Sequence, residues 1–484
     1  MRYAAQRYGT WEWLDLELPL ETDGPEWALS TYGIMTATIA PELGLEKAED
    51  GRPVLEEWGT LIHAEAGSGA SSRKWTGIVV RSELEGKQWE VTVWEFPGYL
   101  DGTPIETKVW GVKVDPADLF RQIWRDVQKR PQAWLGVTVD GTVPKKVGTE
   151  SDDQVIKWKK EVEKAEKRDK EITDQRTKMV DNHRKKADAA RKVIDKKRKE
   201  SMNASKQYYK IPYKDKKKRA AAEKVKNRLD KQLKALNDDY DKMVKQQDAV
   251  LAKFDKDYVK PTEAKLKELR EKLRHWEDKL ADDGGAYKFL PEDTPDAHDS
   301  IAKMCEDVGF EWTTSTRYTE GKPDLRIHIS YPKAGGVRDD LVFEQGVNIL
   351  SELKLERDGI DYANAIIGLG AGEGKKAIRE TMETSHKRLR RVTVHEDRKI
   401  KNKDGMLSRM RRELRKHTGD LYVTEIEVVD HPLAPMFSWN VGDVIRVSGH
   451  VPHYGFINKL HRIISWQMKG DYRAVLKLEL PDAR

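Results

Sequence analysis

The stretch that decides the fold lies at residues 151–172 and reads SDDQVIKWKKEVEKAEKRDKEI. It opens a segment between Gly148 and Gly284 that contains no glycine and only two prolines, Pro212 and Pro261. Lys, Glu, Asp, Ala and Arg dominate this segment, and such a composition favours continuous helix. We therefore predict a helical insertion at residues 151–285.

Apolar side chains recur in this insertion at alternating spacings of three and four residues, which is typical of a coiled-coil seam. The predicted interaction seam consists of Trp158, Val162, Ile172, Leu229, Leu236, Phe254, Leu269, Leu273, Trp276 and Leu280. The same heptad spacing continues through His183, Lys186, Ala190 and Val193 in the first half, and through Val225 and Val250 in the second. Charged residues interrupt the pattern, so we expect an imperfect seam.

The chain is expected to reverse direction near the middle of the insertion. Ser201, Asn203 and Ser205 are weak helix formers, and Pro212 follows them. A reversal there makes an antiparallel hairpin with arms of roughly 60–65 residues, on the order of 90–100 Å long. It also places Trp158 beside Trp276. Pro261 is predicted to kink or restart the returning arm.

The residues before the insertion indicate β structure followed by the start of an α/β domain. Short runs rich in β-branched and aromatic residues, separated by glycine turns, predict a β-barrel-like domain at 1–112. Asp115-Pro116 then provides an N-cap and a first helical residue, and a strand is expected at 135–139. A second helix at 296–308 and a strand at 325–329 follow the insertion. We assign 113–150 and 286–345 to one α/β domain that the hairpin interrupts.

The C-terminal part returns to alternating strand patterns. Residues 346–374 and 419–484 are predicted to form a second β-barrel-like domain, with a small α/β domain inserted at 375–418. A short amphipathic helix in this insert carries Leu407, Met410 and Leu414 on one face. The predicted fold class is therefore α+β and multidomain, and the length of 484 residues agrees with several domains.

Charge is distributed unevenly along the chain. The formal net charge is only +6, but residues 151–283 hold 41 Lys and Arg against 28 Asp and Glu. The remaining residues carry a net charge of −7. Dense basic runs at 196–199 and 216–219 are compatible with nucleic-acid binding. Interleaved acids and the apolar seam favour an ordinary solvated coiled-coil exterior instead.

Several classes of protein and site are disfavoured by the composition. The single cysteine, Cys305, leaves no disulfide framework and no cysteine-based zinc site. No apolar run approaches the roughly 18 residues of a membrane helix, and the N-terminus lacks the apolar core of a signal peptide. We expect a soluble protein made in a reducing compartment, without stable membrane anchoring.

No motif carries recognisable catalytic or cofactor chemistry. The glycine-rich loop at 368–376 has Leu369 and Lys376 where a phosphate-binding loop needs glycine and serine or threonine. His450 and His453 lack the glutamate of a zinc-protease helix, with His461 nearby. Acidic pairs such as Asp339-Asp340 do not discriminate an enzyme in a chain this charged. We predict no catalytic, cofactor-binding or metal-ligating residue and no cofactor.

Tryptophan is concentrated at the front of the chain, where ten of the 15 precede residue 151. Such residues can stack on sugars, but most of them alternate along predicted strands as core residues do. We therefore expect core packing.

The order of motifs in the C-terminal half resembles the hub proteins of siphophage tail tips, a family of minor tail proteins. Gly346 to Leu350 and Asp361 to Asn364 precede the glycine loop, and Val441 to Val447 and Ile463 to Trp466 follow the insert. Residues 115–131 and 136–140 are similar to the start of that family's second, α/β domain. The long hairpin replaces the short link usual there.

The resemblance implies a structural virion protein at the tail tip, or baseplate hub, that is assembled in the host cytoplasm and has no enzymatic activity. In that family the subunits form homotrimers whose two barrels build a pseudo-sixfold ring that adapts the sixfold tail tube to a threefold tip. The expected partners are the distal tail protein, the tape-measure protein and other minor tail proteins, with DNA only as transient cargo through the lumen. The alternatives are a tail-associated cell-wall-degrading enzyme and a basic coiled-coil nucleic-acid-binding protein.

Overall fold

The computed structural model describes the whole chain except residues 68–71, 320, 357–358, 361, 371–376, 385–386, 398–399, 401–402, 418–421 and 482–484. The chain divides into two compact units, one made of 1–150 with 283–484 and the other of 151–282. We call them the globular unit and the hairpin unit. The glycine loop after Gly370 and the family motif residue Asp361 lie outside the described residues.

The N-terminal part of the globular unit forms a seven-stranded antiparallel sheet. In spatial order its strands are β2 (Trp13–Asp15), β1 (Arg2–Arg7), β6 (Thr60–Ala66), β7 (Arg73–Glu85), β8 (Gln88–Glu95), β5 (Ile34–Ile39) and β3 (Glu21–Thr22). Alternate side chains such as Val91 and Val93 are fully buried. Bulges in β2 and β7 bend the sheet. The described strand order ends at the very short β2 and β3, so the predicted barrel-like domain takes the form of a half-barrel.

The C-terminal sheet takes one strand from the other end of the chain. Its strands are β14 (Phe343–Glu344), β21 (Val444–Val451), β22 (Gly455–Met468), β23 (Arg473–Glu479) and β20 (Glu425–Val429), and β4 (Glu26–Ala28) pairs with β22. The rings of Trp27 and Trp466 stack with centroids 4.1 Å apart and planes 13° apart. Buried residues of both sheets belong to one hydrophobic cluster. The two β regions that the sequence predicts as separate domains therefore share a core. A two-stranded pair, β15 (Leu355–Glu356) with β19 (Tyr422–Val423), lies beside the sheet.

A second core joins segments from both sides of the hairpin. This core contains two helices, α2 (Pro116–Val127) and α6 (Ala297–Val308). It also contains a sheet with the strand order β10 (Thr138–Asp140), β13 (Lys322–Ser330) and β12 (Glu311–Thr319). Strand β9 (Val109–Gly111) pairs separately with β11 (Tyr287–Phe289). The predicted helix starts are confirmed, because Asp115 and Asp296 cap α2 and α6 with side-chain oxygens. Gly309 closes α6 at a φ of 84°. Strand β10 precedes the hairpin in sequence and β13 follows it, and the two strands pair in parallel.

The small insert contains β16 (Ala365–Leu369), β17 (Arg379–Glu383), β18 (Val392–Glu396) and α7 (Lys403–Lys416). The predicted amphipathic helix is confirmed, and Met406, Met410 and Leu414 are its buried residues, with Leu407 partly buried. The central strand β16 precedes the predicted boundary at residue 375. A short apolar strand does not reveal in sequence which neighbouring sheet it joins.

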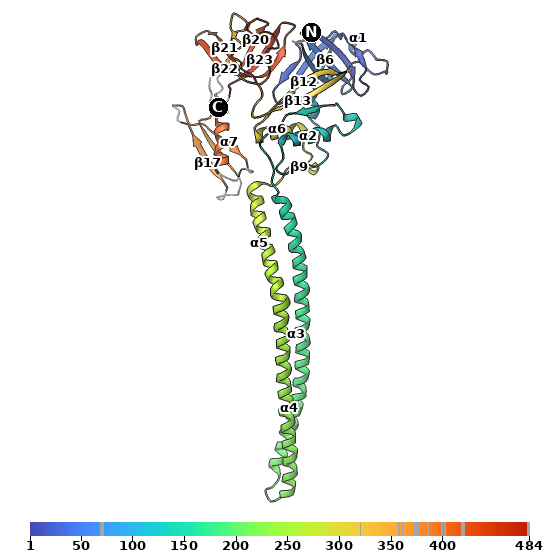
Figure 1. Cartoon of the computed structure of the whole chain (residues 1–484), viewed down its shortest axis with the longest axis vertical. Coiled ribbons are helices and arrows are strands. Elements are labelled where there is room, and N and C mark those ends of the chain that lie inside the picture. The colour runs from blue at the N-terminus through green and yellow to red at the C-terminus, as the bar shows by residue number, and fades with distance from the viewer. Residues whose placement is uncertain are drawn as a thin grey trace. The chain divides into compact units, whose positions relative to one another are not determined.

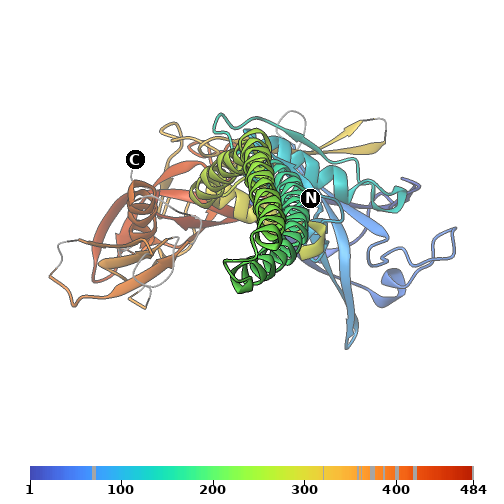
Figure 2. The same cartoon turned by 90° about the horizontal axis from the view of Figure 1, so that it is seen from below.

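The hairpin unit consists of α3 (Ser151–Lys210), α4 (Lys216–Phe254), a π-helical turn (Asp255–Val259) and α5 (Lys260–Asp283). Both views show α3 alongside α4 (Figures 1 and 2). Helix continues through Ser201, Asn203 and Ser205, and the reversal falls at 211–215, so Pro212 marks the turn and the weak helix formers do not. The π-helical turn immediately precedes Pro261, whose ring nitrogen cannot donate the usual helical hydrogen bond. In the described part of the chain, no helix combines the length and the apolarity that crossing a bilayer requires.

Candidate interaction surfaces

None of the ten predicted seam residues is exposed, but few of them are fully buried. Val162, Ile172 and Leu269 are buried, and Leu266 joins Val162 and Leu269 in one small cluster. The half-buried members are Trp158, Leu229, Leu236, Phe254, Leu273, Trp276 and Leu280. Trp158 packs against this cluster, with the ammonium of Lys272 5.1 Å from its ring, and Trp276 makes an edge contact with His275. A two-helix seam is thin, because each side chain is covered from one direction only.

After His183, the predicted heptad positions no longer coincide with the buried positions of α3. Lys186 is exposed and Val193 is 53% exposed, whereas Ala187 and Ala190 are half-buried and Ile194 is buried. Two successive spacings of four residues therefore replace one spacing of three, which is a stutter. A second stutter falls on α4, where Val250 is 51% exposed and Leu251 takes the inward position; Val225 is also exposed. Alanine has a small side chain, so Ala187 does not stand out in the sequence as a seam residue, and the regular heptad spacing predicts Lys186 instead.

Polar contacts across the seam fix the alignment of the two arms. The guanidinium of Arg176 donates to both carboxylate oxygens of Asp255 at 2.6 and 2.9 Å. Arg270 donates to Glu166 at 2.7 Å, and Arg191 donates to the hydroxyl of Tyr240 at 2.8 Å. The hydrogen bond from Arg176 lowers the pKa of Asp255 and raises that of Arg176. Such pairs favour one alignment of the helices over slipped alternatives.

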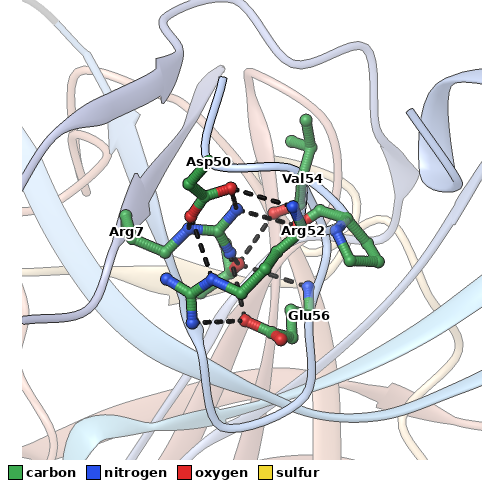
Figure 3. Close-up of polar contacts among 7 residues, drawn as sticks. Arg7, Asp50, Arg52, Val54 and Glu56 are labelled. Carbon is green, nitrogen blue, oxygen red and sulfur yellow. Dashed lines mark hydrogen bonds and ion pairs between the residues drawn. The ribbon is translucent and has the colours of Figure 1, made fainter. Parts of the chain in front are cut away.

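A buried arginine fastens a long loop to the first sheet (Figure 3). Arg7 in β1 is 1% exposed and donates to Asp50 at 3.1 Å, to the Pro53 carbonyl oxygen at 3.0 Å and to Glu56 at 3.3 Å. Arg52 pairs with the same two carboxylates at 2.9 and 3.1 Å. The backbone N–H of Arg52 is the main cause that lowers the pKa of Asp50. Two guanidiniums thus neutralise two carboxylates, an arrangement that suits a structural clamp and not a general acid.

The buried carboxyl group of Glu95 has the strongest features of an acid catalyst but no access to a substrate. Burial raises its pKa to about 7. It accepts hydrogen bonds from the Thr314 hydroxyl and from the Gly33 N–H, and so links β8 to β12. Only 2% of the residue is exposed. A glycosidase needs two carboxyl groups flanking an open bond-cleavage site, which this enclosed position does not offer.

The histidines singled out in the sequence do not converge. His461 is fully buried, where its Nε2 accepts from the Val423 N–H at 2.9 Å and its Nδ1 lies 3.1 Å from the Lys459 carbonyl oxygen. Burial lowers its pKa to about 4. Both ring nitrogens are therefore engaged in the neutral form, and neither is available to a metal. His450 and His453 lie at the exposed end of the β21–β22 hairpin.

A different group could offer metal ligands, and sequence reasoning missed it. Ligand atoms of Asp296, His298 and Asp299 lie within 4.8 Å of one another at the start of α6. The Asp296 carboxylate accepts the Asp299 N–H at 2.9 Å and so acts as the helix N-cap. Capping is a sufficient reason for this cluster.

The predicted core packing of the tryptophan-rich front holds only in part, because three of the ten tryptophans before residue 151 are buried, four are half-buried and three are exposed. Trp75 and Trp124 are almost completely buried. Trp58 is 48% exposed and Trp134 is 52% exposed. A cavity of about 270 Å³ lies in this region, lined by Tyr8, Trp58, Leu61, Ile78, Tyr99, Gln132 and Leu135.

No family model and no curated protein sequence matches the chain. Among solved structures, the chain is similar to the 43 kDa tail protein of prophage MuSo2 from Shewanella oneidensis, with 10% identity and a TM-score of 0.48 over 100% of this chain and 99% of that chain. It is also similar to the E. coli c3393 protein, a type VI secretion component described as similar to the T4 tail proteins gp27 and gp5. That match has 8% identity and a TM-score of 0.39, over 99% of this chain and 77% of that chain.

Proposed function

We propose that this chain is a structural component of a bacteriophage tail, and more specifically a tail-tip hub. In this role three copies form a ring that adapts the sixfold tail tube to a threefold tip. The ring surrounds the lumen through which the tape-measure protein and then DNA pass. The distal tail protein and other minor tail proteins are its neighbours. The proposal extends the resemblance of the motif order to siphophage hub proteins.

The observation that carries the proposal is that the two β regions share a strand pairing and one hydrophobic core. Strand β4 of the first region pairs with β22 of the second, and Trp27 stacks on Trp466. Arg73 of β7 also donates to the Trp439 carbonyl oxygen at 3.3 Å. A subunit that supplies two adjacent segments of a ring must hold them at a fixed spacing. Such a well-packed junction supports that task.

A structural role without enzymatic activity is also consistent with the chemistry of the charged groups. The carboxylates of Asp50 and Glu56 are neutralised by arginines, and Glu95 is enclosed. Asp340, one of the acidic pair noted in the sequence, is held by Arg338 at 2.7 Å, and this contact lowers its pKa. These acids are engaged in holding the fold together.

The oligomeric mass of the purified chain tests the proposal. Light scattering after size exclusion is expected to give three times the 55.7 kDa of one chain at high protein concentration. A dimer or a hexamer would contradict the hub. Zymography against cell walls tests the enzyme alternative in parallel, because a hub leaves no cleared zone. A cleared zone that Glu95→Gln abolishes would favour the enzyme.

The basic charge of the hairpin is the specific observation behind the nucleic-acid alternative. Steeply salt-dependent binding of duplex DNA by the full chain would favour that function over the hub. Weak binding without sequence preference or steep salt dependence would leave the hub as the better account.

A further inference from the structure

The basic surplus of the hairpin is concentrated at its turn. Residues 196–228, which we call the tip segment, contain 14 Lys and Arg but only three Asp and Glu. This surplus of 11 accounts for nearly all of the +13 carried by residues 151–283. The remainder of both arms is close to neutral. A solvated coiled-coil exterior needs mixed charges along its whole length, so it does not explain this concentration.

The turn itself is an ordered structure. The guanidinium of Arg219 lies 4.9 Å from the Tyr208 ring centroid and 4.4 Å from that of Tyr213. The Asp215 N–H donates to the Pro212 carbonyl oxygen at 3.1 Å, and the Arg219 N–H donates to the Asp215 carbonyl oxygen at 3.0 Å. Arg219 therefore fastens the end of α3 to the start of α4, and the aromatic rings are presented in fixed positions.

Large apolar and aromatic side chains remain exposed on this ordered turn. Tyr213 is 82% exposed and Tyr209 is 72% exposed, and Met202, seven residues before Tyr209 on α3, is 53% exposed. Six lysines surround them, and all six are exposed: Lys206, Lys210, Lys214, Lys216, Lys217 and Lys218. In the tip segment, which the structure describes completely, ion pairs involve Lys197, Arg198 and Lys226 and none of these six.

We propose that the tip segment binds the anionic surface of a lipid bilayer in a reversible, peripheral manner. Tyrosine rings are amphipathic and settle at the level of the lipid headgroups. Lysines extend their apolar stems along the membrane boundary while their ammonium groups meet lipid phosphates. Clustered lysines with exposed aromatic residues at one end of an elongated element match this chemistry. The proposal does not depend on the trimeric hub.

Two other polyanions fit the tip segment less well. Duplex DNA would engage the lysines, but its stacked bases offer no place for Tyr209 and Tyr213. The acidic globular unit of a second copy carries a surplus of only seven negative charges over about 350 residues, which does not match a dense basic cluster.

Vesicle flotation of the full chain tests the proposal. The probes are vesicles of pure phosphatidylcholine and vesicles with about a third phosphatidylglycerol. We expect binding to the anionic vesicles only, and a strong decrease as salt rises from ~0.1 to ~0.5 M. The test variant carries Lys→Gln at positions 206, 210, 214, 216, 217 and 218, and it is expected to bind at least about tenfold more weakly.

A matched variant controls for the number of charges removed. It carries Lys→Gln at positions 160, 167, 178, 185, 245 and 253, which are exposed lysines outside the tip segment that form no ion pair in the described structure. We expect it to bind within about twofold of the parent chain, since charges beyond a Debye length of the bilayer contribute little. Far-ultraviolet circular dichroism of both variants verifies the helices.

The tyrosines give a second, independent readout. Tyr209→Ser combined with Tyr213→Ser should weaken vesicle binding about threefold to tenfold while leaving the salt dependence unchanged, because the lost contribution is apolar. Equal binding to both kinds of vesicle, or equal loss in the two lysine variants, would overturn the proposal. It would also be overturned if duplex DNA or a second copy of the chain bound with the same dependence on the six lysines and the vesicles did not bind.

Discussion

The globular unit buries several of its tryptophans completely, whereas the hairpin unit leaves both of its tryptophans half-buried. In the globular unit, Trp75, Trp124 and Trp439 are almost completely buried in cores that several segments build together. In the hairpin unit, Trp158 and Trp276 are only half-buried, and charged residues surround a narrow seam. The first unit is therefore specified by packing between distant segments. The second is specified by local helix propensity and a few contacts between its arms.

The largest difference should appear when the junction of the two sheets is broken. Trp466→Ala removes the stacking partner of Trp27 and leaves a cavity in the shared core. We expect the globular unit to lose about 3–5 kcal/mol of unfolding free energy. Denaturant titration with tryptophan fluorescence measures this loss, and circular dichroism follows the hairpin helices separately. A loss below about 1 kcal/mol would mean that the two sheets do not depend on their shared core.

A smaller effect, confined to the globular unit, should depend on pH. The pKa of Glu95 is raised to about 7 in the folded chain, so its protonated form is favoured by folding. The contribution of Glu95 to the unfolding free energy is fully present below the pKa of the unfolded chain, about 4.5. This contribution is lost as pH rises through about 7. Glu95→Gln should remove this dependence and stabilise the unit by on the order of 2–3 kcal/mol above pH 7.

The Glu95 contribution is measured as the difference between the parent chain and the variant at each pH. This comparison is needed because burial lowers the pKa of His63 to about 3 and that of His461 to about 4. Both histidines therefore lose their contribution to stability as pH falls below about 6.5, which is the opposite direction. A difference that does not change with pH would contradict the role of Glu95.

The hairpin unit should respond more weakly to loss of a seam residue. Leu269→Ala removes a buried side chain from the cluster with Val162 and Leu266. We expect a loss of about 2 kcal/mol, at the low end for a leucine, because the thin seam can relax around the gap. The matched control is Val225→Ala at an exposed position, expected to change stability by less than about 0.5 kcal/mol. Circular dichroism during thermal unfolding measures the stability of both variants. Equal losses of stability in Leu269→Ala and Val225→Ala would contradict a seam at Leu269.

The smallest expected effect concerns the ion pair between the arms. Asp255→Asn leaves Arg176 without its bidentate partner, and we expect a loss smaller than that of Leu269→Ala and absent in high salt. Because the pKa of Asp255 is lowered in the folded chain, the ion pair stabilises the parent hairpin above the pKa that Asp255 has in the unfolded chain. This stabilisation is lost as pH falls through the pKa of Asp255 in the folded chain. Thermal unfolding at neutral and acidic pH measures it. A variant that differs from the parent chain in acid but not at neutral pH would contradict this account.

The comparison also explains what the sequence can predict. Asp115-Pro116 and Asp296 predict where α2 and α6 begin, because these residues cap helices locally. The lack of glycine between Gly148 and Gly284 predicts the helical hairpin. These local signals do not reveal that Trp27 belongs to the C-terminal sheet, because a three-residue strand carries no information about its distant partner. The stutter at Ala187 was missed because alanine contributes little to an apolar repeat. Spacing predicts the ten seam positions but not their degree of burial, because burial depends on how many neighbouring helices cover each side chain.

The central claim is that this chain is a tail-tip hub, and its copy number and position in an assembled particle test it most directly. Electron cryomicroscopy of the phage tail is expected to show three copies around the tail axis at the distal end of the tube. The two sheets of each copy should alternate around the lumen in a pseudo-sixfold ring. Six equivalent copies, or a location away from the tail tip, would contradict the claim.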